Sequence, residues 1–208
     1  MNQRNLFILS LTWVDLLTLA SLLLACLGLL SAWDGRLTLA IGLMTLAMFV
    51  DMLDGFLARR FKLISEFGKY LDGFCDVFTY LILPLFILFQ FGMQDVLSVC
   101  ALFAFLVCGV LRLSRFNIIS TVEEEGVSYH FGLQVIWSHL LVVLAFPVWH
   151  WLGETARYPL VIILFVMSIF MILNLRFPKP VKYTLQTFII LFVTMIYFYL
   201  HFIGIYAP

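Results

Sequence analysis

Four aspartates fall within a short stretch of an otherwise apolar sequence, and they form two pairs. Asp51 and Asp54 are three residues apart, and Asp72 and Asp76 are four residues apart. On an α-helix each spacing places both carboxylates on one face, so two antiparallel helices could bring all four around one point. Carboxylates that close together repel one another unless cations neutralise them. Ligands that are all oxygen favour Mg²⁺, Mn²⁺ or Ca²⁺, and a pair of such ions is a common clamp for a phosphoryl group in transfer.

Small residues and one arginine accompany the four acids. Gly55, Ala58 and Gly68 each lie about one helical turn from an aspartate and leave room for a base or a phosphate to approach the backbone. Arg59 supplies a guanidinium that can pair with phosphate oxygens. A carboxylate at the centre of a membrane span costs about 2.5–3.5 kcal/mol on insertion scales, so acids in such a place indicate function. The alternative interpretation is a set of structural ion pairs.

The composition predicts an all-α integral membrane protein. Of the 208 residues, 64% are hydrophobic and only 12% are charged. Apolar runs of about 20 residues, the length that spans a bilayer, recur along the chain with short polar breaks. We therefore expect one transmembrane domain over residues 1–208, a bundle of six to eight helices, with residues 1–13 as an amphipathic helix at the interface. The seven expected spans are 12–33, 37–58, 70–91, 96–116, 132–152, 157–174 and 183–204.

The basic residues predict the orientation of the bundle, because Lys and Arg near helix ends favour the cytoplasm. Only Arg36 and Arg157, of the twelve basic residues, fall on one side of the expected spans. We therefore expect the N-terminus and the loops around 59–69, 117–131 and 175–182 to face the cytoplasm, in a multi-pass protein of the cell inner membrane. A net charge of zero offers no basic domain for nucleic acid. The ten basic residues on the other side are Arg4, Arg59, Arg60, Lys62, Lys69, Arg112, Arg115, Arg176, Lys179 and Lys182.

The spacing D-x2-D-G-x2-A-R-x8-G-x3-D-x3-D resembles the signature of the CDP-alcohol phosphatidyltransferases. All eight fixed identities of that signature are present, which makes it far more specific than a lone glycine motif. The eight residues are Asp51, Asp54, Gly55, Ala58, Arg59, Gly68, Asp72 and Asp76.

This resemblance implies a fold, a reaction and a role for each residue of the signature. The implied fold is a bundle of six or more transmembrane helices, usually a homodimer, with a polar cavity open to the cytoplasm. In the implied reaction an acceptor hydroxyl attacks the lipid-bearing phosphorus of a CDP-linked lipid such as CDP-diacylglycerol, and CMP leaves. Asp51, Asp54, Asp72 and Asp76 would hold two divalent cations, Mg²⁺ or Mn²⁺, and Asp76 would also be the general base. Gly55, Ala58, Arg59 and Gly68 would contact the cytidine nucleotide.

Residues after the signature bear on the acceptor alcohol. Arg112 and Arg115 share a helix face near the expected cytoplasmic end of the fourth span, and Asn117 follows them. Together with the stretches 131–133 and 174–180, the run 111–117 resembles the phosphatidylserine synthase branch, whose acceptor, serine, carries a carboxylate that an arginine pair could hold. The two arginines could instead bind the diphosphate, or serve only as topology anchors among lipid headgroups.

One departure from the serine branch leaves other acceptors open. That branch usually continues with prolines after Gly132 and Leu133, whereas residues 134–137 here read Gln-Val-Ile-Trp. The nearby aromatic residues could bind a quaternary ammonium group such as choline through cation–π attraction. Ethanolamine, inositol, inositol phosphate and glycerol phosphate also remain open as acceptors. The aromatic residues in question are Tyr129, His130, Trp137 and His139.

Two rival classes of function are less consistent with the sequence. A cation-coupled transporter also carries acids in its spans, but transport acids lie near mid-membrane across repeated halves. Here the acids cluster at one end of two adjacent spans, and we find no internal repeat. A membrane scaffold without chemistry gives no reason for four acids in a bilayer.

Overall fold

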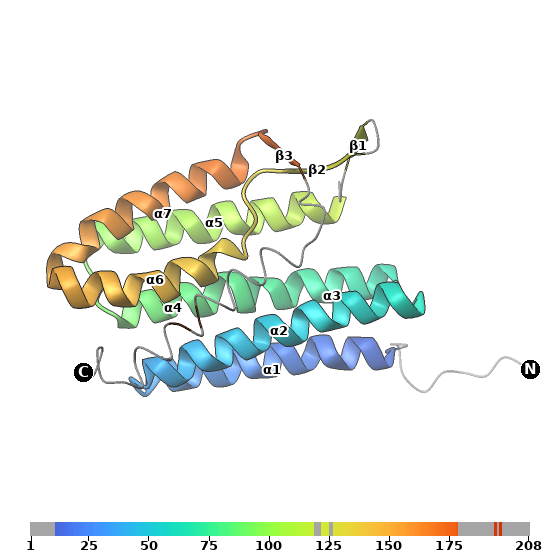
Figure 1. Ribbon diagram of the computed structural model, residues 1–208, viewed down its shortest axis with the longest axis horizontal. Helices are drawn as coiled ribbons and strands as arrows, with labels where there is room; N and C mark the ends of the chain where they lie inside the picture. The colour runs from blue at the N-terminus through green and yellow to red at the C-terminus, as the bar shows by residue number, and fades with distance from the viewer. Residues whose placement is uncertain (1–10, 119–121, 125–126, 179–193, 195, 197–208) are drawn as a thin grey trace, which may run out of the picture.

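The computed structural model describes residues 11–118, 122–124, 127–178, 194 and 196, and within these ranges the chain forms a helical bundle (Figure 1). Five helices are long and apolar enough to cross a membrane, and a sixth apolar helix, α6 (Trp137–Leu152), is shorter. The prediction of an all-α, multi-pass membrane protein is thereby confirmed. The expected span 183–204 and most of the expected interfacial helix 1–13 lie outside the described residues.

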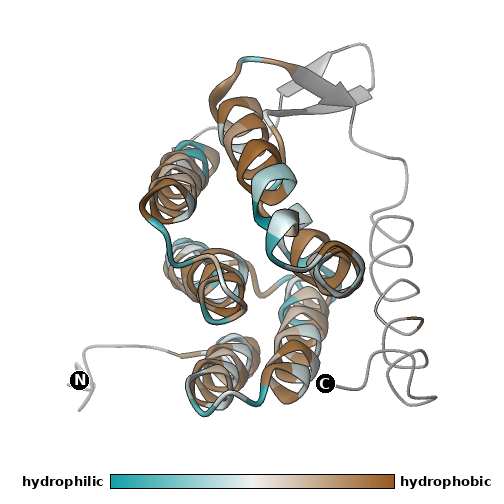
Figure 2. Ribbon diagram, turned by 90° about the vertical axis from the view of Figure 1, so that its left-hand side faces the viewer, coloured by the Kyte–Doolittle hydropathy of each residue, from teal (hydrophilic) through white to brown (hydrophobic). Residues whose placement is uncertain are grey.

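The first two spans pack side by side through small residues. α1 (Trp13–Trp33) and α2 (Leu37–Phe61) form an antiparallel pair. A methyl group added at Gly28 would lie 2.9 Å from a Leu83 methyl carbon and 3.6 Å from the Ala40 carbonyl oxygen, so this glycine allows three helices to approach closely. The opposite face of α1 exposes large apolar side chains such as Leu16, Leu23 and Leu30, as a lipid-facing helix does. Figure 2 shows this apolar character along the bundle, with the more hydrophilic residues gathered toward helix ends.

The third span is one continuous helix with a wider turn in its middle. It comprises α3 (Glu66–Asp76), the π-helical segment η1 (Val77–Ile82) and α4 (Leu83–Gln90). Within it, the Leu83 N–H donates to the Phe78 carbonyl five residues back. Pro84 has no N–H to offer the carbonyl of Tyr80, and the Ser138 hydroxyl from α6 donates to that carbonyl instead, at 2.5 Å.

The remaining helices form the other side of the bundle. α5 (Val96–Ile118) packs along α7 (Arg157–Ile172), and a short 3₁₀ turn, η2 (Gly153–Ala156), joins α6 to α7. Asp95 caps the start of α5 by accepting from the Ser98 N–H at 3.3 Å and from its hydroxyl, and it also pairs with Arg157 at 3.5 Å. Because the connections are short and the helices antiparallel, this ion pair lies at the end of the bundle opposite Asp72 and Asp76.

A small antiparallel sheet joins the segments that follow α5 and α7. Its strands are β1 (Val122–Glu124), β2 (Val127–Phe131) and β3 (Arg176–Pro178), in the order β1-β2-β3. Tyr129 is opposite Val122 on one side and Pro178 on the other. The two loops that the basic residues assigned to one side of the membrane, 117–131 and 175–182, thus meet in one sheet. These strands were not expected from the sequence.

His139 lies in the core of the bundle. Its side chain is 1% exposed, and its Nε2 is 3.3 Å from the Thr45 hydroxyl on α2 and 3.4 Å from the Thr194 hydroxyl. The histidine therefore links α6 to α2 and to residue 194. From the sequence alone, His139 was placed only among the aromatic residues that could bind choline.

Candidate active site

A tight connection between α2 and α3 brings the two aspartate pairs together. Lys62 ends α2 in the left-handed conformation, with φ of 56°, and the Ser65 hydroxyl caps α3 by accepting from the Gly68 N–H at 2.9 Å. The connection is therefore only residues 62–65, which is shorter than the expected loop around 59–69. α2 and α3 return antiparallel, so Asp51 faces the first turns of the third span.

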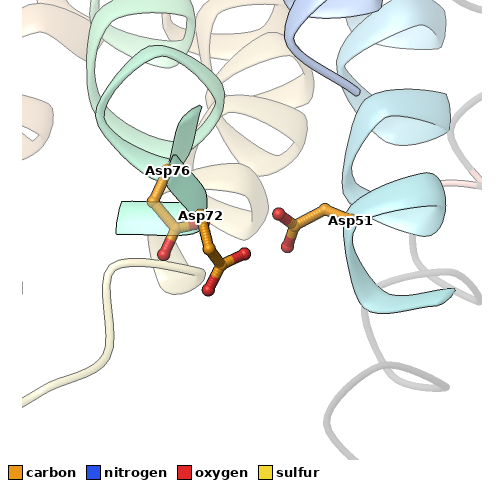
Figure 3. Close-up of side chains that lie close together, drawn as sticks. All are labelled: Asp51, Asp72 and Asp76. Atoms are coloured by element: carbon orange, nitrogen blue, oxygen red, sulfur yellow. The ribbon is translucent and has the colours of Figure 1, made fainter. Parts of the chain in front are cut away.

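Asp51, Asp72 and Asp76 converge on one point between these helices (Figure 3), and we call them the carboxylate cluster. One oxygen from each lies within 4.8 Å of the others, and all three residues are half-buried. Three carboxylates so close together, with no opposing charge among them, require a cation or protons. Their all-oxygen chemistry suits a hard divalent ion.

The hydrogen bonding of Asp51 fits an ion in this place. Its Oδ2 accepts a hydrogen bond of 2.8 Å from the Tyr80 hydroxyl. Its Oδ1 is buried and, among the described residues, has no hydrogen-bond partner. A buried carboxylate oxygen without a donor is costly unless a cation binds it, so the donor set fits a divalent metal.

Asp54 lies beside the carboxylate cluster rather than in it. Its side chain is 3% exposed, and its Oδ2 is buried without a hydrogen-bond partner among the described residues. It is close enough to Asp72 for the two charges to interact, and Thr18 of α1 and Arg59 are further polar neighbours. Asp54, the fourth predicted acid, therefore lies toward α1 and outside the group formed by the other three carboxylates.

The small residues of the signature lie where side chains crowd against the backbone. A methyl group at Gly68 would lie 3.0 Å from the Ser65 hydroxyl oxygen and 3.1 Å from Asp15 Oδ1. At Gly55 it would lie 3.4 Å from a guanidinium nitrogen of Arg59, whose side chain is exposed and folds back along α2. Ala58, between them in sequence, is half-buried.

The two arginines of the predicted anion-binding pair, Arg112 and Arg115, have different neighbours in the structure. Arg112 is half-buried on α5, and its charge acts on the carboxylate of Asp76. Arg115 is exposed, and its Nη2 donates to the Asn174 side-chain oxygen at 3.2 Å, beyond the end of α7. Asn117 belongs to α5, but its side chain is outside the described set.

Two features of the site were not predicted from the sequence: the contact of Tyr80 with Asp51, and the position of α1 beside the acidic residues. Tyr80 follows Asp76 by four residues, a spacing that places both on one helix face and could have signalled the contact. Asp15 forms a capping box with Thr12, at 2.7 Å and 3.2 Å, at the start of α1. Asp15 also approaches Gly68, and α1 therefore closes the acidic site from a third side.

Comparison with known proteins gives a consistent result over nearly the whole chain. A CDP-diacylglycerol–serine O-phosphatidyltransferase of Helicobacter pylori is 30% identical over 190 residues, covering 86% of this chain and 78% of the relative. An archaetidylserine synthase of Methanothermobacter thermautotrophicus is 27% identical over 168 residues, covering 79% and 69%. A phosphatidylcholine synthase of Brucella melitensis is 40% identical over 83 residues, but covers only 38% of this chain and 30% of the relative.

A comparison with models of protein families also gives a match over most of the chain. The model of the CDP-alcohol phosphatidyltransferase family matches residues 11–207, which include every helix described above. With three carboxylates of the signature gathered on two antiparallel helices of a membrane bundle, we conclude that this chain is an enzyme of the CDP-alcohol phosphatidyltransferase family.

Proposed function

We propose that this enzyme transfers the phosphatidyl group of CDP-diacylglycerol to L-serine and releases CMP. The observation that carries the proposal is that the charge of Arg112 acts on Asp76, a member of the carboxylate cluster. A fixed cation beside the acids that handle the phosphoryl group suits an acceptor that carries its own carboxylate. The serine phosphatidyltransferase and the archaetidylserine synthase among the relatives support the same acceptor.

In this proposal Asp51, Asp54, Asp72 and Asp76 hold two divalent cations, Mg²⁺ or Mn²⁺. Bound cations of this kind offset the negative charge on the diphosphate of the lipid substrate. The exposed Arg59 pairs with phosphate oxygens, while the small residues Gly55, Ala58 and Gly68 let the cytidine nucleotide lie against α2 and α3.

Asp76 also acts as the general base. Its carboxylate takes the proton of the serine hydroxyl as that oxygen forms a bond to the lipid-bearing phosphorus. The bond from that phosphorus to the oxygen of CMP breaks, and CMP leaves with the electron pair. Arg112 holds the serine carboxylate so that the hydroxyl points at phosphorus, and Arg115 and Asn117 complete the anion-binding surface toward the loop.

The setting we propose follows the distribution of basic residues. The enzyme is one domain over residues 1–208 in the inner membrane of the cell, with the carboxylate cluster facing the cytoplasm, where CDP-lipids and serine meet. We further propose that it is a homodimer, as is usual in the family that it resembles.

The test is CMP release by the purified protein in detergent, from CDP-diacylglycerol with Mn²⁺ or Mg²⁺. Serine, choline, ethanolamine, inositol, inositol phosphate and glycerol phosphate are offered in separate reactions. We expect release with serine. Release with another alcohol but not with serine would support the proposed type of reaction and contradict serine as the acceptor. No release with any of them would contradict the reaction and favour a transporter.

Choline is the second candidate acceptor. It is supported by the 40% identity to a phosphatidylcholine synthase over 83 residues. A quaternary ammonium has no carboxylate for Arg112, so the two acceptors differ in what they require of this residue. The same panel of reactions distinguishes them, and the Arg112 variant described in the Discussion gives an independent answer.

A further inference from the structure

The Tyr80 side chain reaches from the third span to Asp51, the member of the carboxylate cluster that lies on the second span. Its hydroxyl donates to Asp51 Oδ2 at 2.8 Å, and the tyrosine is 5% exposed. The family signature ends at Asp76 and does not include this residue. We propose that Tyr80 is a positioning residue, which sets the orientation of the Asp51 carboxylate for divalent-cation binding. This inference rests on the proposed role of Asp51 as a metal ligand.

The two carboxylate oxygens of Asp51 differ in their hydrogen bonding. Oδ2 is occupied by the phenol, whereas Oδ1 is buried and has no hydrogen-bond partner among the described residues. With Oδ2 fixed, the carboxylate cannot rotate freely, so the Asp51 side chain stays close to the carboxylates of Asp72 and Asp76. A phenol suits this position because it donates one hydrogen bond without adding positive charge that would compete with a cation.

The backbone of Tyr80 is itself held by α6. Tyr80 lies in η1, where Pro84 cannot donate to its carbonyl group, and the buried Ser138 hydroxyl takes that place at 2.5 Å. The wider π-helical turn changes the direction in which the side chains after Asp76 leave the helix. A chain of contacts therefore runs from Ser138 on α6 through Tyr80 to Asp51 on α2.

Groups that orient a metal ligand commonly contribute about 10–100-fold to metal affinity. We therefore expect Tyr80→Phe, which removes only the hydroxyl, to weaken binding of Mn²⁺ by about that factor. At saturating Mn²⁺ the variant should recover most of its turnover, because no group of the proposed chemistry has been removed. A residue with a merely structural role would lower activity at every metal concentration and leave Mn²⁺ affinity unchanged.

The experiment is a titration of the purified full-length protein in detergent with Mn²⁺ alone, in which electron paramagnetic resonance measures the free ion. The parent, Tyr80→Phe and Tyr158→Phe are compared. Tyr158 is the matched control, since it loses the same hydroxyl from an exposed position at the start of α7, at the opposite end of the bundle. We expect a weaker Mn²⁺ Kd for Tyr80→Phe only. A Tyr80→Phe protein that binds Mn²⁺ as tightly as the parent would overturn the proposal.

A second variant keeps the test decisive if Tyr80→Phe does not fold. Ser138→Ala releases the Tyr80 backbone and should weaken Mn²⁺ binding several-fold, whereas an unchanged Kd would count against the proposed role. CMP release, measured on the same samples, separates this inference from the proposed function. A parent that binds Mn²⁺ but releases no CMP contradicts the proposed function alone, while equal Mn²⁺ affinity in an active Tyr80→Phe variant contradicts this inference alone.

Discussion

One carboxylate oxygen of Asp51 on α2 lies within 4.8 Å of one carboxylate oxygen of Asp76 on α3, and Asp72 lies beside both (Figure 3). The short connection at residues 62–65 makes this possible, because it returns the chain within one helical turn. The charge of Arg112 also acts on Asp76. Asp76 is therefore the acid that we propose for both cation binding and proton transfer from the acceptor alcohol.

Replacing Asp76 by Asn should abolish CMP release. The amide cannot take the proton of the acceptor hydroxyl, and a general base contributes about 10²–10⁴-fold to rate. We expect a loss of at least that size in kcat, with the fold and metal-dependent nucleotide binding largely retained. Asp34→Asn is the matched control, since Asp34 is exposed at the end of α1 and should tolerate the change. Turnover retained in the Asp76→Asn variant would contradict the general-base role.

Removing divalent ions should stop the reaction reversibly. The carboxylate cluster has no lysine or arginine within it, so its charges need a cation before an anionic diphosphate can approach. We expect chelation with EDTA to eliminate CMP release and added Mg²⁺ or Mn²⁺ to restore it. Undiminished activity after exhaustive chelation would contradict the assignment of these residues as metal ligands.

Acid should weaken the end of the bundle opposite the carboxylate cluster. Hydrogen bonds from Ser98, with a contribution from Arg157, hold the pKa of Asp95 below its ordinary value. A carboxyl group whose pKa is lower in the folded state adds stability above its unfolded pKa, near 4, and loses that contribution as the pH falls through the folded value.

Asp95→Asn should therefore lower the midpoint of thermal unfolding in detergent modestly at pH 7, and this difference from the parent should shrink as the pH falls through the folded pKa of Asp95. The effect is modest because the pair with Arg157 is partly open to solvent. A difference between variant and parent that stays constant across this pH range would show that the charge of Asp95 does not contribute.

Gly132 should be the glycine least tolerant of a side chain. Its φ of 72° disfavours other residues, and a methyl group there would overlap the Met171 carbonyl oxygen of α7. The backbone is fixed here, because the Gly132 N–H donates to Leu175 and the Leu133 N–H donates to Phe170. Backbone strain and overpacking each cost about 1–3 kcal/mol.

We therefore expect Gly132→Ala to lower the midpoint of thermal unfolding strongly. Gly35→Ala is the matched control, because Gly35 has a similar φ of 75° but no atom within 4 Å of the added carbon. The difference between the two variants isolates the contact with α7. Equal shifts would mean that the backbone conformation alone determines the cost.

The helices and the acids could be predicted from the sequence because their signals are local. Apolar runs located α1, α2 and α5 to within about two or three residues, and the spacing of the aspartates placed each pair on one face. The start of α3 was expected four residues too late, because its first turn is polar and depends on the Ser65 cap. The start of α6 was expected five residues too early, since residues 132–136 form a loop held by contacts with α7.

The missed features of the site depend on contacts between distant parts of the chain. The spacing from Asp76 places Tyr80 on the face of the acids, but it identifies neither Asp51 as the partner of the Tyr80 hydroxyl nor Ser138 as the partner of its carbonyl. The different neighbours of Arg112 and Arg115 could not be predicted for the same reason. The i, i+3 spacing indicates that the two arginines share a helix face, but not which residues each one contacts. The Arg115 guanidinium hydrogen-bonds to Asn174, which follows the C-terminal end of α7 and is 59 residues away in sequence.

Arg112→Gln distinguishes the two candidate acceptors. If serine is the acceptor, loss of a charged partner for its carboxylate removes about 1.5–3 kcal/mol of binding, and KM for serine should rise by roughly 10–100-fold. Arg115→Gln should have a smaller effect, because the Arg115 guanidinium already bonds Asn174. Arg36→Gln, at the opposite end of the bundle, is the control for loss of a positive charge. An unchanged KM for serine in Arg112→Gln would contradict the proposed role, and turnover of choline unaffected by the same change would favour the quaternary ammonium as the natural acceptor.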